Sequence, residues 1–238
     1  MTKLVTSTLF GHLFITLSSI FNLYSSSSSS AEVSTTTLTL LATLLGAYLT
    51  ADLGSGVLHW STDNYGSKKT PLFGVVIDAF QGHHAQQQTI VQRPTINNIH
   101  KLCYPFSPVF LSPLLAVQAA TNSNDLSLLT IFLGVFSVLE IMSQEFHRAA
   151  HTPKNKTHPI LNFTMDKGLT INRKQHTAHH KNPYDGNYCI VSGVWNEWLD
   201  DNLAWRWMEK RVFDVTGVEP NSWKLDETGR NKKLAMKF

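Results

Sequence analysis

The sequence predicts an all-α fold, and specifically a multi-pass membrane helical bundle. Three apolar stretches, at about 36–58, 104–120 and 126–143, contain few charged side chains. Each has about the ~20 residues that a helix needs to cross a bilayer. The first contains Asp52 and the third contains Glu140. Acidic groups inside a span are costly, so we expect these two to be paired or functional.

The distribution of basic residues supports the membrane interpretation. The chain has 238 residues, 16% charged residues and a net charge of +3. This composition is too apolar for a disordered protein, and the charge is too small to indicate a nucleic-acid partner. If the second and third stretches form a hairpin, then residues 59–101 and 144–238 lie on one side. That side holds 19 of the 20 Lys and Arg residues, as the positive-inside rule requires.

The N-terminal region differs from the rest of the chain. Residues 1–31 contain no acid, and residues 25–30 are all serine. An acid-poor, serine-rich start is typical of organelle transit peptides, although a secretory signal or a short anchor at 9–24 is an alternative. We expect residues 1–34 to be a leader that is disordered or cleaved, and residues 35–238 to form one membrane domain.

Histidine is unusually frequent in this chain. There are 11 histidines but only 2 cysteines, which excludes zinc sites built from three or four thiolates. Eight of the histidines form four groups: His59; His83 and His84; His147 and His151; and His176, His179 and His180. Helix positions i, i+3 and i+4 share a face, so members of the last two groups can point at a common space. Asp63 lies four residues after His59, so the two can share a helix face, and Asp63 could add a carboxylate ligand.

The predicted topology brings the four groups to one membrane side. The first apolar stretch ends at His59, the hairpin leaves after the His83 pair, and it returns just before His147. Imidazole suits zinc, copper, iron and nickel, and eight ligands exceed the four that one zinc ion takes. The sequence therefore predicts a histidine-rich di-metal site on one side of the bundle. The adjacent pair His83 and His84 diverges by about 100° on a helix and could serve two metals.

Several motifs resemble those of plant plastid fatty acid desaturase 4-type proteins. The resemblance covers about residues 45–200 and extends to the wider lipid desaturase family, which includes the plasmanylethanolamine desaturases. The motifs are the segments 51–60, 63–66, 79–84, 144–151, 173–180 and 187–193.

The resemblance implies a membrane desaturase with a di-iron centre that uses O2 as co-substrate. The implied iron ligands are His59, His83, His84, His147, His151, His176, His179 and His180. Asp63 and His100 are possible additional or outer partners. No catalytic residue is expected beyond the metal ligands.

The resemblance also implies a substrate and a location. The plastid branch places a trans double bond at carbon 3 of palmitate on phosphatidylglycerol. We therefore expect a chloroplast membrane, with the endoplasmic reticulum membrane as the alternative. No dinucleotide-binding glycine pattern is visible, so electrons are expected from a separate carrier, which would be ferredoxin in a plastid.

Three alternative functions stay open at this stage. A lipid hydroxylase could use the same scaffold with nearly the same ligands. A plasmanylethanolamine-type desaturase would share the histidine pattern but act on another lipid. A non-catalytic metal-binding relative would keep the ligands without the reaction.

Overall fold

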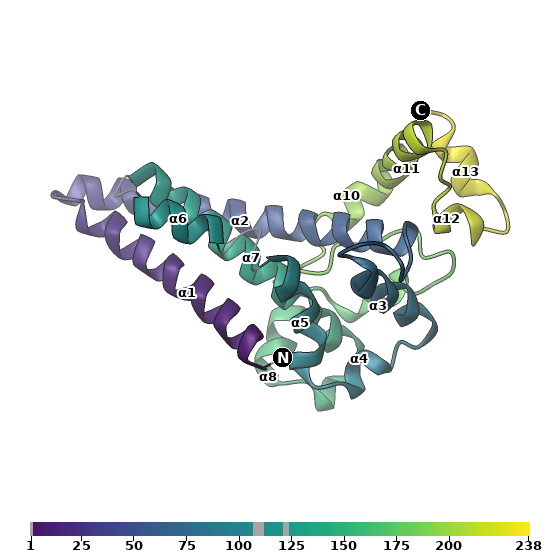
Figure 1. The fold of residues 1–238 in the computed structure, drawn as a ribbon, viewed down its shortest axis with the longest axis horizontal. Helices are drawn as coiled ribbons and strands as arrows, with labels where there is room; N and C mark the ends of the chain where they lie inside the picture. Colours follow the sequence, from purple (N-terminus) through teal and green to yellow (C-terminus); the bar gives the residue numbers. More distant parts are fainter. Residues whose placement is uncertain (1, 107–111, 121–123) are drawn as a thin grey trace. The chain divides into compact units, whose positions relative to one another are not determined.

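The computed structural model describes residues 2–106, 112–120 and 124–238 of the chain, and within these ranges every regular element is a helix (Figure 1). This confirms the predicted all-α class. In chain order the helices are α1 Thr2–Ser25, α2 Ser30–Asn64, α3 Gly74–Ala85, α4 Thr89–Gln92, α5 Thr95–Phe106, α6 Ser112–Ala120, α7 Asn124–His151, the 3-10 helix η2 Lys154–Lys156, α8 Pro159–Asp166, α9 Arg173–His179, α10 Asn196–Asp201, α11 Ala204–Thr216, α12 Asn221–Lys224 and α13 Arg230–Ala235.

Three helices are long and apolar enough to cross a membrane, by length and composition. They are Lys3–Ser25, Ser30–Asn64 and Leu126–His151. The second and third contain the expected stretches 36–58 and 126–143. Large apolar side chains on these helices face outwards: Phe14 and Phe21 of α1 are 70% and 72% exposed. Such a surface is suited to hydrocarbon rather than to water.

Two other expected segments, 104–120 and 1–34, do not each correspond to a single element of the structure. The stretch 104–120 includes residues 107–111, which lie outside the described residues, and its described parts belong to α5 and α6. The expected leader 1–34 is helical over Thr2–Ser25, and this helix is itself a candidate span. Cleavage of the leader stays a prediction.

The chain divides into two compact units. The first contains residues 1–51 and 94–144, and the second contains residues 52–93 and 145–238. In the first unit, Leu23, Leu40 and Ile131 form a buried cluster. Gly134 of α7 lies where this helix approaches Thr16 of α1 closely, as is common between membrane helices.

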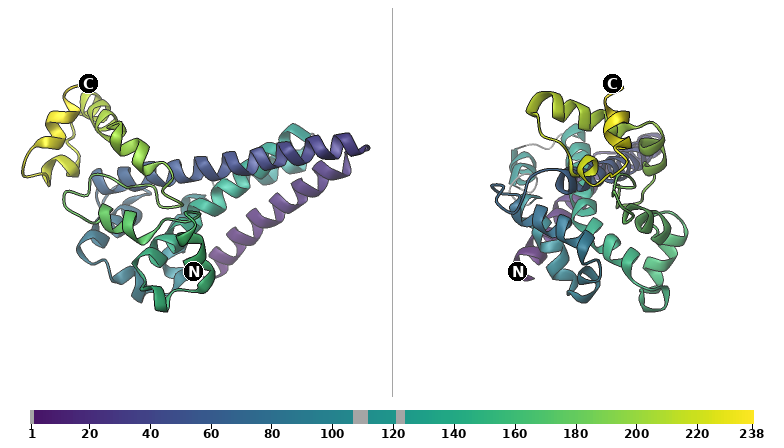
Figure 2. Two further views of the ribbon diagram at one scale, coloured as in Figure 1. Left: turned by 180° about the vertical axis from the view of Figure 1, so that it is seen from behind. Right: turned by 90° about the vertical axis from the view of Figure 1, so that its right-hand side faces the viewer.

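The second unit contains all eight candidate histidine ligands and Asp63. Its main core is a cluster of aromatic and apolar side chains, namely Trp60, Tyr188, Cys189, Leu199 and Trp205. Helix α9 begins at an N-cap, because the side chain of Asn172 accepts a hydrogen bond from the Gln175 amide at 3.0 Å. Helices α11, α12 and α13 pack together at the C-terminus, as the views in Figure 2 show.

Replacement of Gly134 by alanine should destabilise the first unit. A Cβ at this position would lie 2.1 Å from Thr16 Oγ1, and that hydroxyl already donates to the His12 carbonyl at 2.8 Å. We expect overpacking of this kind to cost about 1–3 kcal/mol, measured by thermal unfolding in detergent. Gly46→Ala is the matched control, because the nearest atom would be Phe132 Cε2 at 3.7 Å. An unchanged unfolding temperature for Gly134→Ala would contradict the close helix approach.

Candidate metal centre

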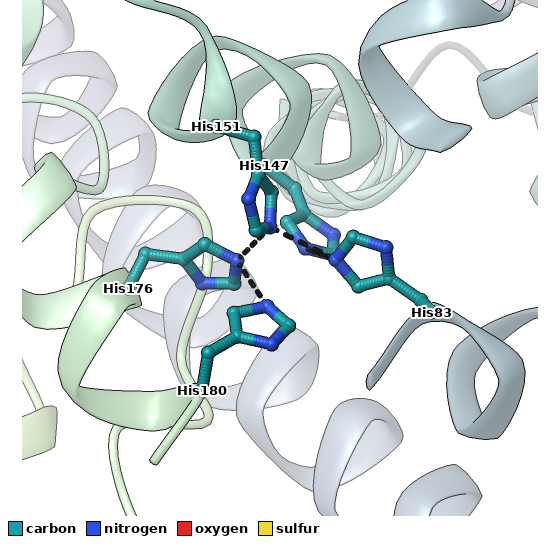
Figure 3. Close-up of side chains that lie close together, drawn as sticks. All are labelled: His83, His147, His151, His176 and His180. Carbon is teal, nitrogen blue, oxygen red and sulfur yellow. Dashed lines mark hydrogen bonds between the residues drawn. The ribbon is translucent and has the colours of Figure 1, made fainter. Parts of the chain in front are cut away.

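Five imidazoles converge on one point in the second unit (Figure 3). His83 comes from α3, His147 and His151 come from the last turns of α7, and His176 and His180 come from α9 and the residue that follows it. One ring nitrogen of each lies within 4.8 Å of all the others. These five residues are called the five-histidine group below.

The nitrogens of the five-histidine group are in direct contact. His83 Nε2 lies 2.9 Å from His151 Nε2 and 3.0 Å from His147 Nε2. His176 Nε2 lies 2.7 Å from His151 Nε2 and 3.0 Å from His180 Nε2. Nitrogens bound at ~2.1 Å to one ion and at right angles to each other would be ~3 Å apart. The spacing therefore fits a metal ion bound by these side chains.

Burial keeps the imidazoles of this group neutral. It lowers the pKa of His83, His176 and His180 well below the usual value, and the neighbouring imidazoles lower it further. A neutral imidazole is the form that binds a metal. The electrostatics of the site therefore favour ligation over protonation.

A second group combines three imidazoles with a carboxylate. His59, Asp63, His84 and His179 also offer ligand atoms within 4.8 Å of one another. The Nε2 atoms of the three histidines lie at 3.3 Å (His59), 3.0 Å (His84) and 3.5 Å (His179) from Asp63 Oδ2. These four residues are called the aspartate group.

Main-chain carbonyls fix the orientation of two rings in the aspartate group. His59 Nδ1 lies 3.0 Å from the Tyr188 carbonyl, and His179 Nδ1 lies 2.8 Å from the Gly186 carbonyl. A carbonyl only accepts, so each Nδ1 carries a proton, and Nε2 is the ring atom left to bind a metal. Both Nε2 atoms face the Asp63 carboxylate oxygen, an arrangement of donor atoms that fits a cation between them. Such outer hydrogen bonds are typical of metal-bound histidines.

The two adjacent histidine pairs divide between the groups. His83 and His180 belong to the five-histidine group, whereas His84 and His179 belong to the aspartate group. The ring centroids of His83 and His84 are 6.4 Å apart, and those of His179 and His180 are 5.2 Å apart. Neighbouring side chains on one helix diverge, so each pair places one ligand in each group.

The structure thus brings all eight histidines and Asp63 into two neighbouring groups. His100 is in neither group. It belongs to the first unit, where its Nδ1 donates to the Asn97 carbonyl at 2.9 Å.

One face of α2 holds the segment 187–193 beside the aspartate group. Asp52 Oδ1 accepts hydrogen bonds from the amides of Ser192 at 2.6 Å and Gly193 at 2.8 Å. The Ile190 amide donates to Ser55 Oγ at 3.0 Å, and Ser55 lies four residues before His59 on the helix. The positioning role of Asp52 is not evident from the sequence, where the only signal is an acid within an apolar stretch.

The close contact of this segment with α2 also requires a glycine. A Cβ at Gly56 would lie 2.4 Å from Cys189 Sγ and 3.3 Å from the Cys189 amide nitrogen. The absence of a side chain at residue 56 therefore lets the segment lie against the helix and bring the Tyr188 carbonyl to His59.

Arg173 attaches α9 to the residues that follow α7. Its Nε donates to the Thr152 carbonyl at 2.9 Å, and its Nη2 donates to Thr157 Oγ1 and Asn162 Oδ1, both at 2.9 Å. The helix that carries His176 and His179 is thereby fixed next to the helix that carries His147 and His151.

A cavity of about 320 Å³ reaches the aspartate group, because Asp63 and His84 are among its lining residues. Gln81, Tyr184 and Ser222 also line it. The Tyr184 ring lies against His84, with 4.3 Å between centroids. The cavity therefore lies beside the carboxylate side of the centre.

Comparison with known protein families agrees with this arrangement. Residues 48–223 match the lipid desaturase domain, a range that includes every member of both groups. The chain belongs to the lipid desaturase family. Within this lipid desaturase domain, the two groups account for eight of the chain's 11 histidines.

Among curated relatives, the chain is similar to fatty acid desaturase 4, chloroplastic, from Arabidopsis thaliana, with 42% identity over 74% of this chain and 52% of the relative. The Arabidopsis fatty acid desaturase 4-like 1, chloroplastic, is 39% identical over 74% of this chain and 57% of that protein. The plasmanylethanolamine desaturase of Myxococcus xanthus is 28% identical over 84% of this chain and 69% of that protein.

The chain spans about half the length of the first of these curated relatives. No solved structure matches the chain.

Replacement of Asp52 by alanine should detach the 187–193 segment. The carboxylate also accepts from the Trp195 amide at 3.3 Å, so three amides would lose their acceptor. Each unsatisfied buried donor costs about 1–3 kcal/mol. We expect a large loss of thermal stability and new protease cleavage within 187–195, detected by mass spectrometry. Asp52→Asn keeps one acceptor oxygen and should have a smaller effect. Equal effects of the two variants would contradict this role of the carboxylate.

Proposed function

We propose that this protein is a membrane acyl-lipid desaturase that introduces a double bond into a lipid-bound acyl chain. In the net reaction, two neighbouring carbons each lose one hydrogen, and O2 takes these together with two electrons and two protons to give two waters. The proposal rests on the membership of the lipid desaturase family together with the two ligand groups.

The observation that carries the proposal is the presence of two adjacent groups with nine ligand residues between them. Two iron ions are the proposed occupants, one in the five-histidine group and one in the aspartate group. When bound, they supply the O2 chemistry that removes hydrogen from an unactivated carbon chain, a step that side chains alone cannot perform.

The residues of the chain hold and shield this centre. The Tyr188 and Gly186 carbonyls orient His59 and His179, and Asp63 adds one negative charge to its group. His59, His147, His176 and His179 are at most 2% exposed. Exclusion of water protects reactive species from side reactions.

The substrate and compartment are proposed by similarity. The proposed substrate is palmitate on phosphatidylglycerol, desaturated to a trans double bond at carbon 3, in a multi-pass chloroplast membrane protein. The names of the two Arabidopsis relatives include "chloroplastic", which supports this location. Ferredoxin is the proposed electron donor.

Expression of the full chain in a host without this activity, with iron and ferredoxin supplied, should yield a new unsaturated lipid. Mass spectrometry of phosphatidylglycerol should show the loss of two hydrogens from its acyl chain. A gain of one oxygen would instead identify a hydroxylase, and a new vinyl ether in phosphatidylethanolamine would identify a plasmanylethanolamine-type desaturase. No new lipid at normal iron content would favour a non-catalytic relative.

Removal of a single ligand should abolish this product. His147→Ala removes a nitrogen from the five-histidine group and should lower product formation at least ~100-fold, because outer partners alone already change activity by ~10–100-fold. His158→Asn is the matched control, because His158 is exposed and its role as an N-cap of α8 is retained by asparagine. Full activity of His147→Ala would contradict the proposed ligand assignment.

A further inference from the structure

A buried ion pair lies outside both metal groups. Arg206 and Glu209 of α11 are 3% and 0% exposed, and Arg206 Nη2 lies 2.8 Å from Glu209 Oε1. Burial raises the pKa of Glu209, and the Arg206 guanidinium opposes this shift. Burying two charges costs several kcal/mol per ion unless further hydrogen bonds satisfy them. The further hydrogen bonds of Arg206 and Glu209 connect this ion pair to the residues around the aspartate group.

On one side, the ion pair is connected to the end of α2. Ser222 Oγ donates to Glu209 Oε1 at 2.8 Å, and Trp223 Nε1 donates to Glu209 Oε2 at 2.6 Å. The Ser222 amide donates to Asn64 Oδ1 at 2.9 Å, and Asn221 Nδ2 donates to the Asp63 carbonyl at 2.7 Å. Ser222, which binds Glu209, thus also binds the side chain of Asn64, and its chain neighbour Asn221 binds the backbone of the carboxylate ligand Asp63.

On the other side, the ion pair is connected to the loop that orients His179. Arg206 Nη2 donates to the Asp185 carbonyl at 3.2 Å. The next residue, Gly186, accepts the His179 Nδ1 hydrogen bond. Two residues further on, Tyr188 accepts the hydrogen bond from His59. The loop that contains Asp185 therefore orients two of the three imidazoles of the aspartate group.

The two sides join at Asn64. Its Nδ2 donates to the Trp60 carbonyl at 2.9 Å and to the Tyr188 hydroxyl at 3.1 Å. One network of hydrogen bonds thus connects Asn64, Tyr188, Arg206, Glu209 and Ser222. This network lies next to the aspartate group, where α11 and α12 pack. Among the described residues, no hydrogen bond or ion pair joins Glu209 or Arg206 to a member of the five-histidine group.

We propose that Glu209, paired with Arg206, is a positioning residue for the aspartate group. It sets the distance between Asp63 and the carbonyl acceptor of His179, so that the ligand atoms converge on one ion. The C-terminal helices α11 and α12 are then part of the metal centre although they supply no ligand. This inference rests on the proposed two-metal function and adds a specific requirement for one of the two sites.

Cobalt(II) binding to the full chain in detergent tests the proposal without lipid turnover. The metal-free protein is titrated with cobalt(II), and visible absorption reports each site, because an all-imidazole site and a carboxylate-containing site absorb differently. Wild type should bind two ions. Glu209→Gln should weaken the carboxylate-containing site by about 10–100-fold, the usual effect of losing an outer partner, and leave the five-histidine site unchanged.

Two further variants keep the test decisive. Asn221→Ala removes only the bond to the Asp63 carbonyl, so it should weaken the same site even if Glu209→Gln fails to fold. Asp214→Asn is the matched control, because Asp214 forms an exposed ion pair with Lys210 on the same helix at 2.5 Å. This control should bind both ions as wild type does.

Two results would overturn the inference. One is unchanged binding at the carboxylate-containing site in Glu209→Gln and Asn221→Ala. The other is equal weakening of both sites, which would make the ion pair a general packing element. A wild type that binds two ions and shows the selective loss but forms no lipid product would contradict only the proposed function. Binding of one ion by wild type would contradict both proposals.

Discussion

The attachment of the 187–193 segment to one face of α2 is the constraint on which the aspartate group depends. Asp52, Ser55, Gly56 and His59 lie at i, i+3, i+4 and i+7 along the helix, and each contacts this segment through a hydrogen bond or a close approach. A helix face is rigid, so it fixes the position of the Tyr188 carbonyl, and this carbonyl fixes the His59 ring. The carbonyl of Gly186, just before this segment, fixes the His179 ring in the same way. Because His180 follows His179 in the chain and belongs to the five-histidine group, the constraint also reaches that group.

Main-chain groups satisfy three buried polar side chains of the second unit. Asp52 accepts only from amides, whereas His59 and His179 donate to carbonyls. Main-chain partners are fixed in place by the fold and lose little conformational entropy, unlike long side chains. Asp52 and His59 also lie in a helix that is apolar enough to cross a membrane, where an unsatisfied polar group is especially costly. The acid within the apolar stretch is therefore paired, as the sequence predicts for such a residue.

The sequence predicts which histidines lie together, because spacing on a helix is a local property. His147 and His151, and His176 and His180, are i, i+4 pairs, and the structure places each pair in one group. The separation of His83 from His84 follows from the divergence of neighbouring side chains. The roles of Glu209 and Asn221 could not be predicted, because they depend on contacts between residues more than 140 positions apart, such as Asn221 and Asp63. The sequence left the N-terminal segment open between a leader and a short anchor, since leader peptides and membrane anchors share its composition, and the structure has a candidate span at Lys3–Ser25.

The two metal groups are chemically unequal, and the difference follows from Asp63. The five-histidine group offers five neutral nitrogens, so it leaves the whole charge of a bound ion uncompensated. The aspartate group offers three nitrogens and one carboxylate, which lowers the local charge by one unit and adds a harder oxygen donor. It also supplies fewer ligands, and catalytic metal sites typically keep a position open. Asp63 Oδ1 is buried without a hydrogen-bond partner among the described residues, and the cavity that reaches Asp63 and His84 lies on this side. The cavity, the charge compensation and the smaller donor set thus coincide at the aspartate group, whereas the five-histidine group consists of imidazoles alone, of which His83, His147 and His176 are buried.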